Sequence, residues 1–237
     1  MCIDCVRVSR RNFMSLAASG VATAGIWAVS GKLSPGLAAT NLTSDESLAR
    51  LKAGNERFVN APQLCEEGLR DARANTAEDQ SPWATVLTCS DSRVSPELIF
   101  GGVGIGELFV ARNAGNVADT AVMGTIEYGA EHLGTPLVVV LGHQRCGAVQ
   151  AACDVVEKHV RLEGSIRPMV DAIVPAAKSQ RGKSGDFVDN AVRENARRNA
   201  AKILAGSKII RHLVHEGKVK VVYARYDLES GVVAFLG

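Results

Sequence analysis

Residues 136–147 have the sequence Pro-Leu-Val-Val-Val-Leu-Gly-His-Gln-Arg-Cys-Gly, an apolar run that passes directly into side chains capable of chemistry. A continuous run of branched apolar residues is typical of a strand that is buried on both faces. Residues 83–88, Trp-Ala-Thr-Val-Leu-Thr, form a similar run and lead into Cys-Ser-Asp-Ser-Arg at 89–93. We therefore expect two buried strands that each end in reactive residues.

The patterns on either side of these runs predict an α/β fold. We predict further strands at 107–112, 218–226 and 232–236, and helices at 44–60, 119–133, 149–160 and 186–216. Strands that alternate with helices indicate a mostly parallel central β-sheet flanked by helices. Residues 228–231, Leu-Glu-Ser-Gly, predict a hairpin turn, so the C-terminal strand is expected to be antiparallel.

The helix at 44–60 is expected to form an N-terminal helical arm. Thr43 and Glu46 have the spacing of a capping box, in which a hydroxyl and a carboxylate satisfy the first N–H groups of a helix. Little sequence lies nearby for the apolar face of this helix to pack on. We therefore expect the arm to embrace another subunit.

Composition and charge exclude several classes of protein. Hydrophobic residues make up 46% of the 237 residues and charged residues 22%, which is typical of a globular domain. Residues 1–39 contain four basic groups and one acidic group, which leaves 23 basic and 24 acidic groups in residues 40–237. A nucleic-acid partner is not expected, because the domain at 40–237 lacks the excess of basic residues that such proteins use.

Residues 1–39 have the pattern of an export signal. Arg10 and Arg11 precede an uncharged, alanine- and glycine-rich run at 15–29, and Leu-Ala-Ala at 37–39 offers small residues for cleavage. The paired arginines indicate the twin-arginine route, which carries folded proteins, and therefore a periplasmic location. The alternative is an uncleaved membrane anchor, although the apolar run is short for a span of about 20 residues. Membrane contact is expected only through this segment.

The two strand ends predict a metal site formed by Cys89, His143 and Cys146. Sites in open α/β sheets form beyond the carboxyl ends of the strands, so the two segments are expected to meet. Two cysteines and one histidine suit zinc and leave a fourth tetrahedral position for water, as in a catalytic site. Plain core cysteines, or a disulfide between Cys89 and Cys146 in an oxidising compartment, are the alternatives.

Asp91 and Arg93 follow Cys89 at a spacing that places their side chains on the same side of an extended segment. A two-point contact with the Arg93 guanidinium would hold the Asp91 carboxylate away from the metal. Asp91 would then orient a metal-bound hydroxide, which predicts hydration or hydrolysis. Without that restraint, Asp91 is a possible fourth ligand in a closed state.

These residues resemble the zinc signature of the β-class carbonic anhydrases, Cys89-x-Asp91-x-Arg93 followed by His143-x-x-Cys146. Blocks at 51–58, 106–116, 126–128 and 226–231 also resemble that family, so the similarity spans about residues 44–237. The resemblance implies the reaction CO₂ + H₂O ⇌ HCO₃⁻ + H⁺ through zinc-bound hydroxide, with one zinc ion per subunit. It also implies assembly as a homodimer or homotetramer.

The resemblance further implies a substrate pocket formed by Gln80, Phe109, Ala114, Tyr128 and Gly147. In the family pattern Gln80 would contact a substrate oxygen, the Gly147 N–H would touch bicarbonate, and the other three would form an apolar wall. Val86 stands where the bicarbonate-inhibited subgroup has tryptophan, which implies the always-open, plant-like subgroup. Gln144 replaces a common serine, and we expect its side chain to face away from the metal.

Two other functions stay open at this point. A zinc enzyme of the same fold would hydrolyse CS₂ or COS, because these are also small linear heterocumulenes. A zinc-binding or thiol-redox module would keep the metal but lack turnover. Asp91, Arg93 and Gln80 favour an enzyme, since a storage or structural site does not need them.

Overall fold

The computed structural model describes residues 40–61 and 76–237. The export signal predicted at 1–39 lies outside the described residues. The described elements are α1 (Ser44–Asn60), β1 (Ala84–Cys89), α3 (Pro96–Ile99), β2 (Leu108–Asn113), α4 (Thr120–Glu131), β3 (Leu137–His143), α5 (Gly147–Lys158), α6 (Ile166–Asp171), α7 (Val174–Gln180), α8 (Phe187–Gly206), α9 (Lys208–His215), β4 (Lys220–Tyr226) and β5 (Val233–Phe235).

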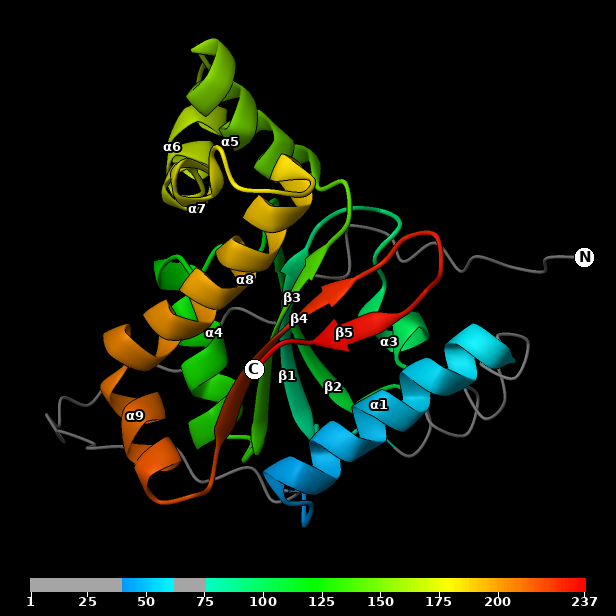
Figure 1. Ribbon diagram of the computed structural model, residues 1–237. Helices are drawn as coiled ribbons and strands as arrows, with labels where there is room; N and C mark the ends of the chain where they lie inside the picture. The colour runs from blue at the N-terminus through cyan, green and yellow to red at the C-terminus, as the bar shows by residue number, and fades with distance from the viewer. Residues whose placement is uncertain (1–39, 62–75) are drawn as a thin grey trace, which may run out of the picture. The chain divides into compact units, whose positions relative to one another are not determined.

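The five strands form one sheet in the order β2-β1-β3-β4-β5 (Figure 1). β1 pairs in parallel with β2 and β3, β3 pairs in parallel with β4, and β5 is antiparallel to β4. Every residue of β1 and β3 is buried, as their continuous apolar runs predict. The mostly parallel sheet with an antiparallel C-terminal strand is therefore confirmed.

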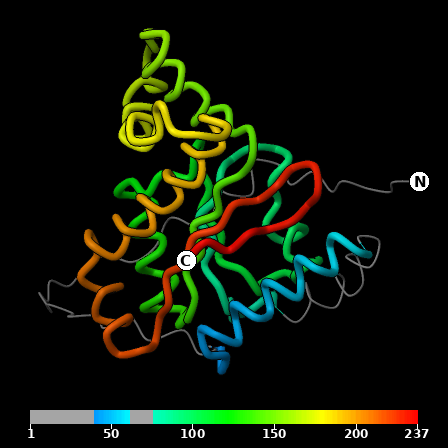
Figure 2. Tube along the Cα trace, in the orientation of Figure 1, coloured from blue at the N-terminus to red at the C-terminus, as the bar shows by residue number. Residues whose placement is uncertain are grey.

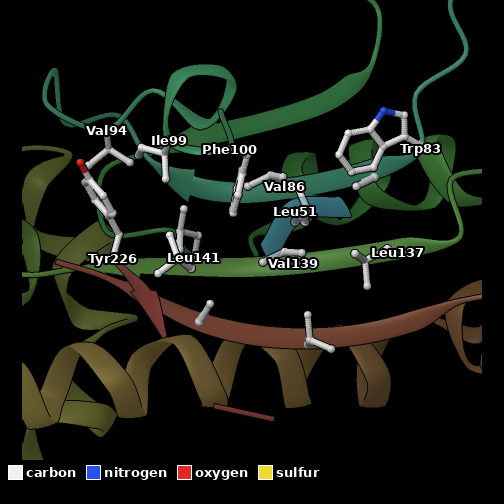
Figure 3. Packing of buried hydrophobic residues seen from close by; sticks show 14 residues of the cluster. Leu51, Trp83, Val86, Val94, Ile99, Phe100, Leu137, Val139, Leu141 and Tyr226 are labelled. Carbon is white, nitrogen blue, oxygen red and sulfur yellow. The ribbon is translucent and has the colours of Figure 1, made fainter. Parts of the chain in front are cut away.

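Helices cover both faces of the sheet. Successive residues of a strand point to opposite faces, and in the buried strands both sets of side chains are apolar, so both faces need cover. Val138 and Val140 of β3 pack in a core shared with α4, α8 and α9. Val139 and Leu141 point the other way, toward Leu51 of α1 and the end of α3 (Figure 3). The strand ends that carry the predicted metal ligands therefore lie between two packed layers of helices.

The predicted N-terminal arm forms and packs on its own chain, and its embrace of another subunit stays a prediction. Its capping box is present, with the Thr43 hydroxyl accepting the Glu46 N–H and the Glu46 carboxylate accepting the Thr43 N–H. Asn55 donates hydrogen bonds to the carbonyls of Ile99 and Gly231, which ties α1 to α3 and to the β4–β5 hairpin beside it (Figure 2). These segments supply the partner that local sequence lacks.

The single helix predicted at 186–216 is wrong, because α8 and α9 are separate helices joined at Ser207. Ser207 is extended (φ −97°, ψ 121°), and its hydroxyl accepts the Ile210 N–H and donates to Glu127. The short helices α3, α6 and α7 were also not predicted. Among the described residues, no helix has the length and apolar character needed to cross a membrane.

Candidate metal centre and active site

The strand ends bring the three predicted ligands together. β1 ends at Cys89 and β3 ends at His143, and the two strands are paired in register as far as Thr88 and Leu141. The chain then turns back, and Cys146 becomes the N-cap of α5. The ligand atoms of Cys89, His143 and Cys146 all lie within 4.8 Å of one another, so the convergence predicted from the sequence is confirmed.

The geometry of these three side chains fits a zinc ion. The two sulfurs are 3.9 Å apart, close to the roughly 3.8 Å expected between two tetrahedral zinc–sulfur bonds of about 2.3 Å. The thiols of Cys89 and Cys146 are free rather than joined in a disulfide. All three side chains are buried, as a dry and well-shaped metal site requires.

The imidazole of His143 is oriented for metal binding. Its Nδ1 lies 3.0 Å from the backbone oxygen of Gln144, so Nδ1 carries the proton and Nε2 is left as an acceptor. Nε2 is fully buried and has no hydrogen-bond partner in the described part of the chain. Such an orphaned acceptor is unfavourable in a protein interior, and a metal ion at this point would satisfy it.

The two thiols behave as a coupled pair that favours one thiolate. The Cys146 S–H donates to the Cys89 sulfur and lowers the pKa of Cys89 to about 4, although burial acts in the opposite direction. Donating that hydrogen bond, together with burial, raises the pKa of Cys146, while the N–H groups of Val149 and Ala148 at the start of α5 act to lower it. A divalent cation would complete the second deprotonation.

Asp91 lies beside this ligand set without joining it. Its carboxylate accepts two hydrogen bonds from the Arg93 guanidinium, from Nε at 2.9 Å and from Nη2 at 2.8 Å. Asp91 Oδ2 is 3.8 Å from Nε2 of His143. The hydrogen bonds from Arg93 hold the pKa of Asp91 well below its usual range, despite partial burial. Asp91 is therefore an ionised acceptor that Arg93 holds at the edge of the metal site.

Sequence reasoning missed several groups that support the ligands. The backbone N–H of Gly115 donates to Cys89 Sγ at 3.3 Å. Arg112 donates to the backbone oxygens of Cys89 and Asp91, at 3.0 and 2.8 Å, and so fixes the segment that carries both side chains. Gln144 accepts the Leu228 N–H of the hairpin with its side chain, while its carbonyl orients the imidazole.

The predicted pocket residues divide into two groups within one chain. Ala114 directly follows Asn113, the residue of β2 that is level with Cys89, and Gly147 follows Cys146 as the first residue of α5. Phe109 pairs with Thr85, four residues before the level of Cys89, which is roughly 13 Å along the strand.

Tyr128 lies beside Phe109, and Gln80 lies before the amino-terminal end of β1, whereas the ligands lie at its carboxyl end. The Tyr128 ring centroid is 6.0 Å from that of Phe109, and the exposed Gln80 precedes the start of β1. A single chain therefore does not bring these three side chains to the metal centre.

Comparisons with known proteins agree with this arrangement. The carbonic anhydrase family model matches residues 84–233. The chain is 38% identical over 182 residues to carbonic anhydrase 2 of Mycobacterium tuberculosis, which covers 76% of this chain and 87% of the relative. It also resembles the Coccomyxa β-carbonic anhydrase solved with acetazolamide, with a TM-score of 0.62, 26% identity and coverage of 83% of this chain and 87% of that one.

A mostly parallel sheet whose strand ends bring a Cys-His-Cys set beside an ionised carboxylate is the arrangement of a zinc-dependent enzyme, in which these three side chains would hold the ion. The chain belongs to the β-class carbonic anhydrase family. It catalyses the reversible hydration of carbon dioxide, a small-molecule substrate, with zinc as its cofactor.

Replacing one predicted ligand tests the metal centre directly. We expect Cys146→Ala to lose at least about tenfold in zinc affinity, because a coordinating thiolate is removed from a buried three-residue site. Cys153→Ala is the matched control, since Cys153 is also a buried free thiol of α5. Zinc content after dialysis against a chelator, measured by elemental analysis, should fall only for Cys146→Ala. Equal retention by both variants would contradict the assignment.

Proposed function

We propose that this carbonic anhydrase works in the open, plant-like mode, with Asp91 and Arg93 as its gatekeeping pair. The observation that carries the proposal is the two-point contact from Arg93 to both carboxylate oxygens of Asp91. That contact keeps Asp91 from occupying the fourth position beside the ligands. Val86, which stands where the bicarbonate-inhibited subgroup has tryptophan, is fully buried in the core and supports the same mode.

Zinc, when bound, supplies a Lewis acid that lowers the pKa of a water molecule. Within the described residues, Asp91 Oδ2 accepts one side-chain hydrogen bond, from Arg93, and so keeps acceptor capacity toward the reacting water. An ionised carboxylate can only accept a hydrogen bond, so it turns the oxygen lone pair of that water toward the carbon of CO₂. The Gly147 N–H, at the first position of α5, is placed to donate to an oxygen of the bicarbonate product.

Removing the gatekeeping carboxylate tests its role in the reaction. We expect Asp91→Ala to lower CO₂ hydration by about 10²-fold or more, because the reacting water loses its orienting acceptor. Zinc content should stay at the wild-type level, since Asp91 is not one of the three ligands. Stopped-flow hydration assays with metal-loaded protein make this measurement.

Asp154→Ala is the matched control for that experiment, because Asp154 is a carboxylate of α5 that pairs with Lys158 instead of Arg93. It should keep wild-type activity. An Asp91→Ala variant as active as this control, or hydration that survives Cys146→Ala, would contradict the proposed mechanism.

We also propose that the enzyme assembles as a homodimer, alone or as half of a homotetramer, across the free edge of β2. β2 is the edge strand of the sheet, and Tyr128 beside it is 45% exposed. A two-fold axis through this edge would set the two β2 strands antiparallel. The amino-terminal half of one β2, with Phe109 and Tyr128, would then face the carboxyl end of the other, where the ligands lie.

Subunit complementation distinguishes a shared pocket from a pocket made by one chain. Cys146→Ala and Gln80→Ala chains, refolded together, would form heterodimers in which one site carries both changes and the other carries neither. We expect recovery of about a quarter of wild-type CO₂ hydration in an equal mixture, as random pairing dictates. A mixture of Cys146→Ala with Asp91→Ala is the control and should not recover, because both residues belong to the ligand side. Absence of recovery in the first mixture would contradict the shared pocket.

We propose that residues 1–39 direct export by the twin-arginine route to the periplasm. The uncharged run after Arg10 and Arg11 supports this, as does the nature of the metal site. Two neighbouring free thiols are open to oxidation in an oxidising compartment, and a route that carries folded proteins allows the metal to occupy them first.

Fractionation of cells that express the full chain tests the export proposal. Replacing Arg10 and Arg11 with lysine should retain the enzyme in the cytoplasm, because the twin-arginine pair is lost. The control is Arg7→Lys, which changes an arginine outside that pair and should leave periplasmic carbonic anhydrase activity unchanged. The same distribution for both variants would contradict the proposal.

A further inference from the structure

Two buried asparagines of α8 lie close to the metal centre and have no part in the reaction described above. Asn195 is 1% exposed and Asn199 is 5% exposed. They are one helical turn apart, and Asn199 Nδ2 donates to the backbone oxygen and to the side-chain Oδ1 of Asn195, at 2.9 and 3.1 Å. Burying a side-chain amide is unfavourable unless it is hydrogen-bonded. The hydrogen-bond partners of Asn195 and Asn199 therefore indicate what the two side chains do.

Both asparagines hold the loop that connects β2 to α4. Asn195 Nδ2 donates to the backbone oxygen of Gly115 at 2.8 Å. Asn199 Oδ1 accepts the backbone N–H of Ala118, also at 2.8 Å. The loop is therefore attached to α8 at two points, although the residues involved are about 80 positions apart in the chain.

The residue that Asn195 holds also contacts a metal ligand. Gly115 accepts from Asn195 with its carbonyl and donates with its N–H to Cys89 Sγ at 3.3 Å. Its backbone has a φ of +82°, and a Cβ at this position would lie 2.4 Å from Ile173 Cδ1. Glycine is thus required for the close approach, and the Asn195 amide anchors a residue whose own side chain cannot do so.

We propose that Asn195, supported by Asn199, is a positioning residue for the metal centre. It holds Gly115 so that its N–H stays hydrogen-bonded to the Cys89 sulfur. That hydrogen bond withdraws charge from the thiolate. Two thiolates together neutralise the charge of a divalent ion, so each hydrogen bond to sulfur preserves part of the acidity of the metal. The inference rests on the proposed function, because it takes Cys89 as a metal ligand.

Cobalt(II) substitution of the full-length enzyme tests the proposal with a readout that does not depend on turnover. The sulfur-to-cobalt charge-transfer band reports the charge on the thiolate ligands. We expect Asn195→Leu to shift this band to longer wavelength, because the Cys89 sulfur becomes a stronger donor. We also expect metal affinity in a chelator competition to fall by about 10–100-fold, because the loop that holds the Cys89 ligand in position is no longer anchored to α8. Asn199→Ala should cause a smaller shift in the same direction, and it provides a second, milder variant if Asn195→Leu does not fold.

Asn55→Leu is the matched control, because Asn55 is also a buried asparagine with hydrogen bonds to backbone groups, on α1 rather than α8. It should destabilise the fold, measured by chemical denaturation, and leave the charge-transfer band in place. An unshifted band in both α8 variants, or an equal shift in Asn55→Leu, would overturn the proposal. Failure of the proposed function is separately visible, since the wild-type protein would then lack the band or would not hydrate CO₂.

Discussion

The parallel pairing of β1 with β3 is the constraint on which the metal centre depends. It places Cys89 and His143 at the same edge of the sheet, and the Thr88 hydroxyl donates to the Leu141 carbonyl at the last paired level before them. A slip of one residue would turn every side chain of a strand to the opposite face of the sheet. Because both strands are buried at every position, the apolar contacts on both faces oppose such a slip.

Burial of the ligands creates a requirement that the surrounding backbone meets. Cys89 and Cys146 lie in an apolar cluster with Val149 and Ile173, where polar atoms without partners are unfavourable. Carbonyl and N–H groups of nearby loops therefore bond the ligand side chains. The same low-polarity surroundings strengthen the interaction between the metal centre and a nearby carboxylate. The burial that strengthens these interactions also makes the ligand side chains unfavourable to bury when no metal ion is bound.

Much of the fold could be predicted from the sequence, because buried strands and amphipathic helices leave periodic apolar patterns. The strand that contains Val138–Leu141 and the capping box at Thr43 are clear examples. The break at Ser207 could not be predicted, since one residue interrupts a helical pattern that continues on both sides. What favours the break is the hydrogen bond from Ser207 to Glu127, a contact between residues 80 positions apart.

The site shows the same division between short-range and long-range information. The three ligands and the Asp91–Arg93 pair were predictable, because their side chains carry the chemistry and each group directly follows a predicted buried strand. The groups that orient them are largely backbone atoms, and a carbonyl such as that of Gln144 has no signature in a sequence. Strand direction explains the rest. Residues at the amino-terminal half of β2 cannot reach ligands at the carboxyl end of β1 in the same chain. A sequence pattern therefore indicates the chemistry of the pocket residues, but it does not say which subunit supplies them.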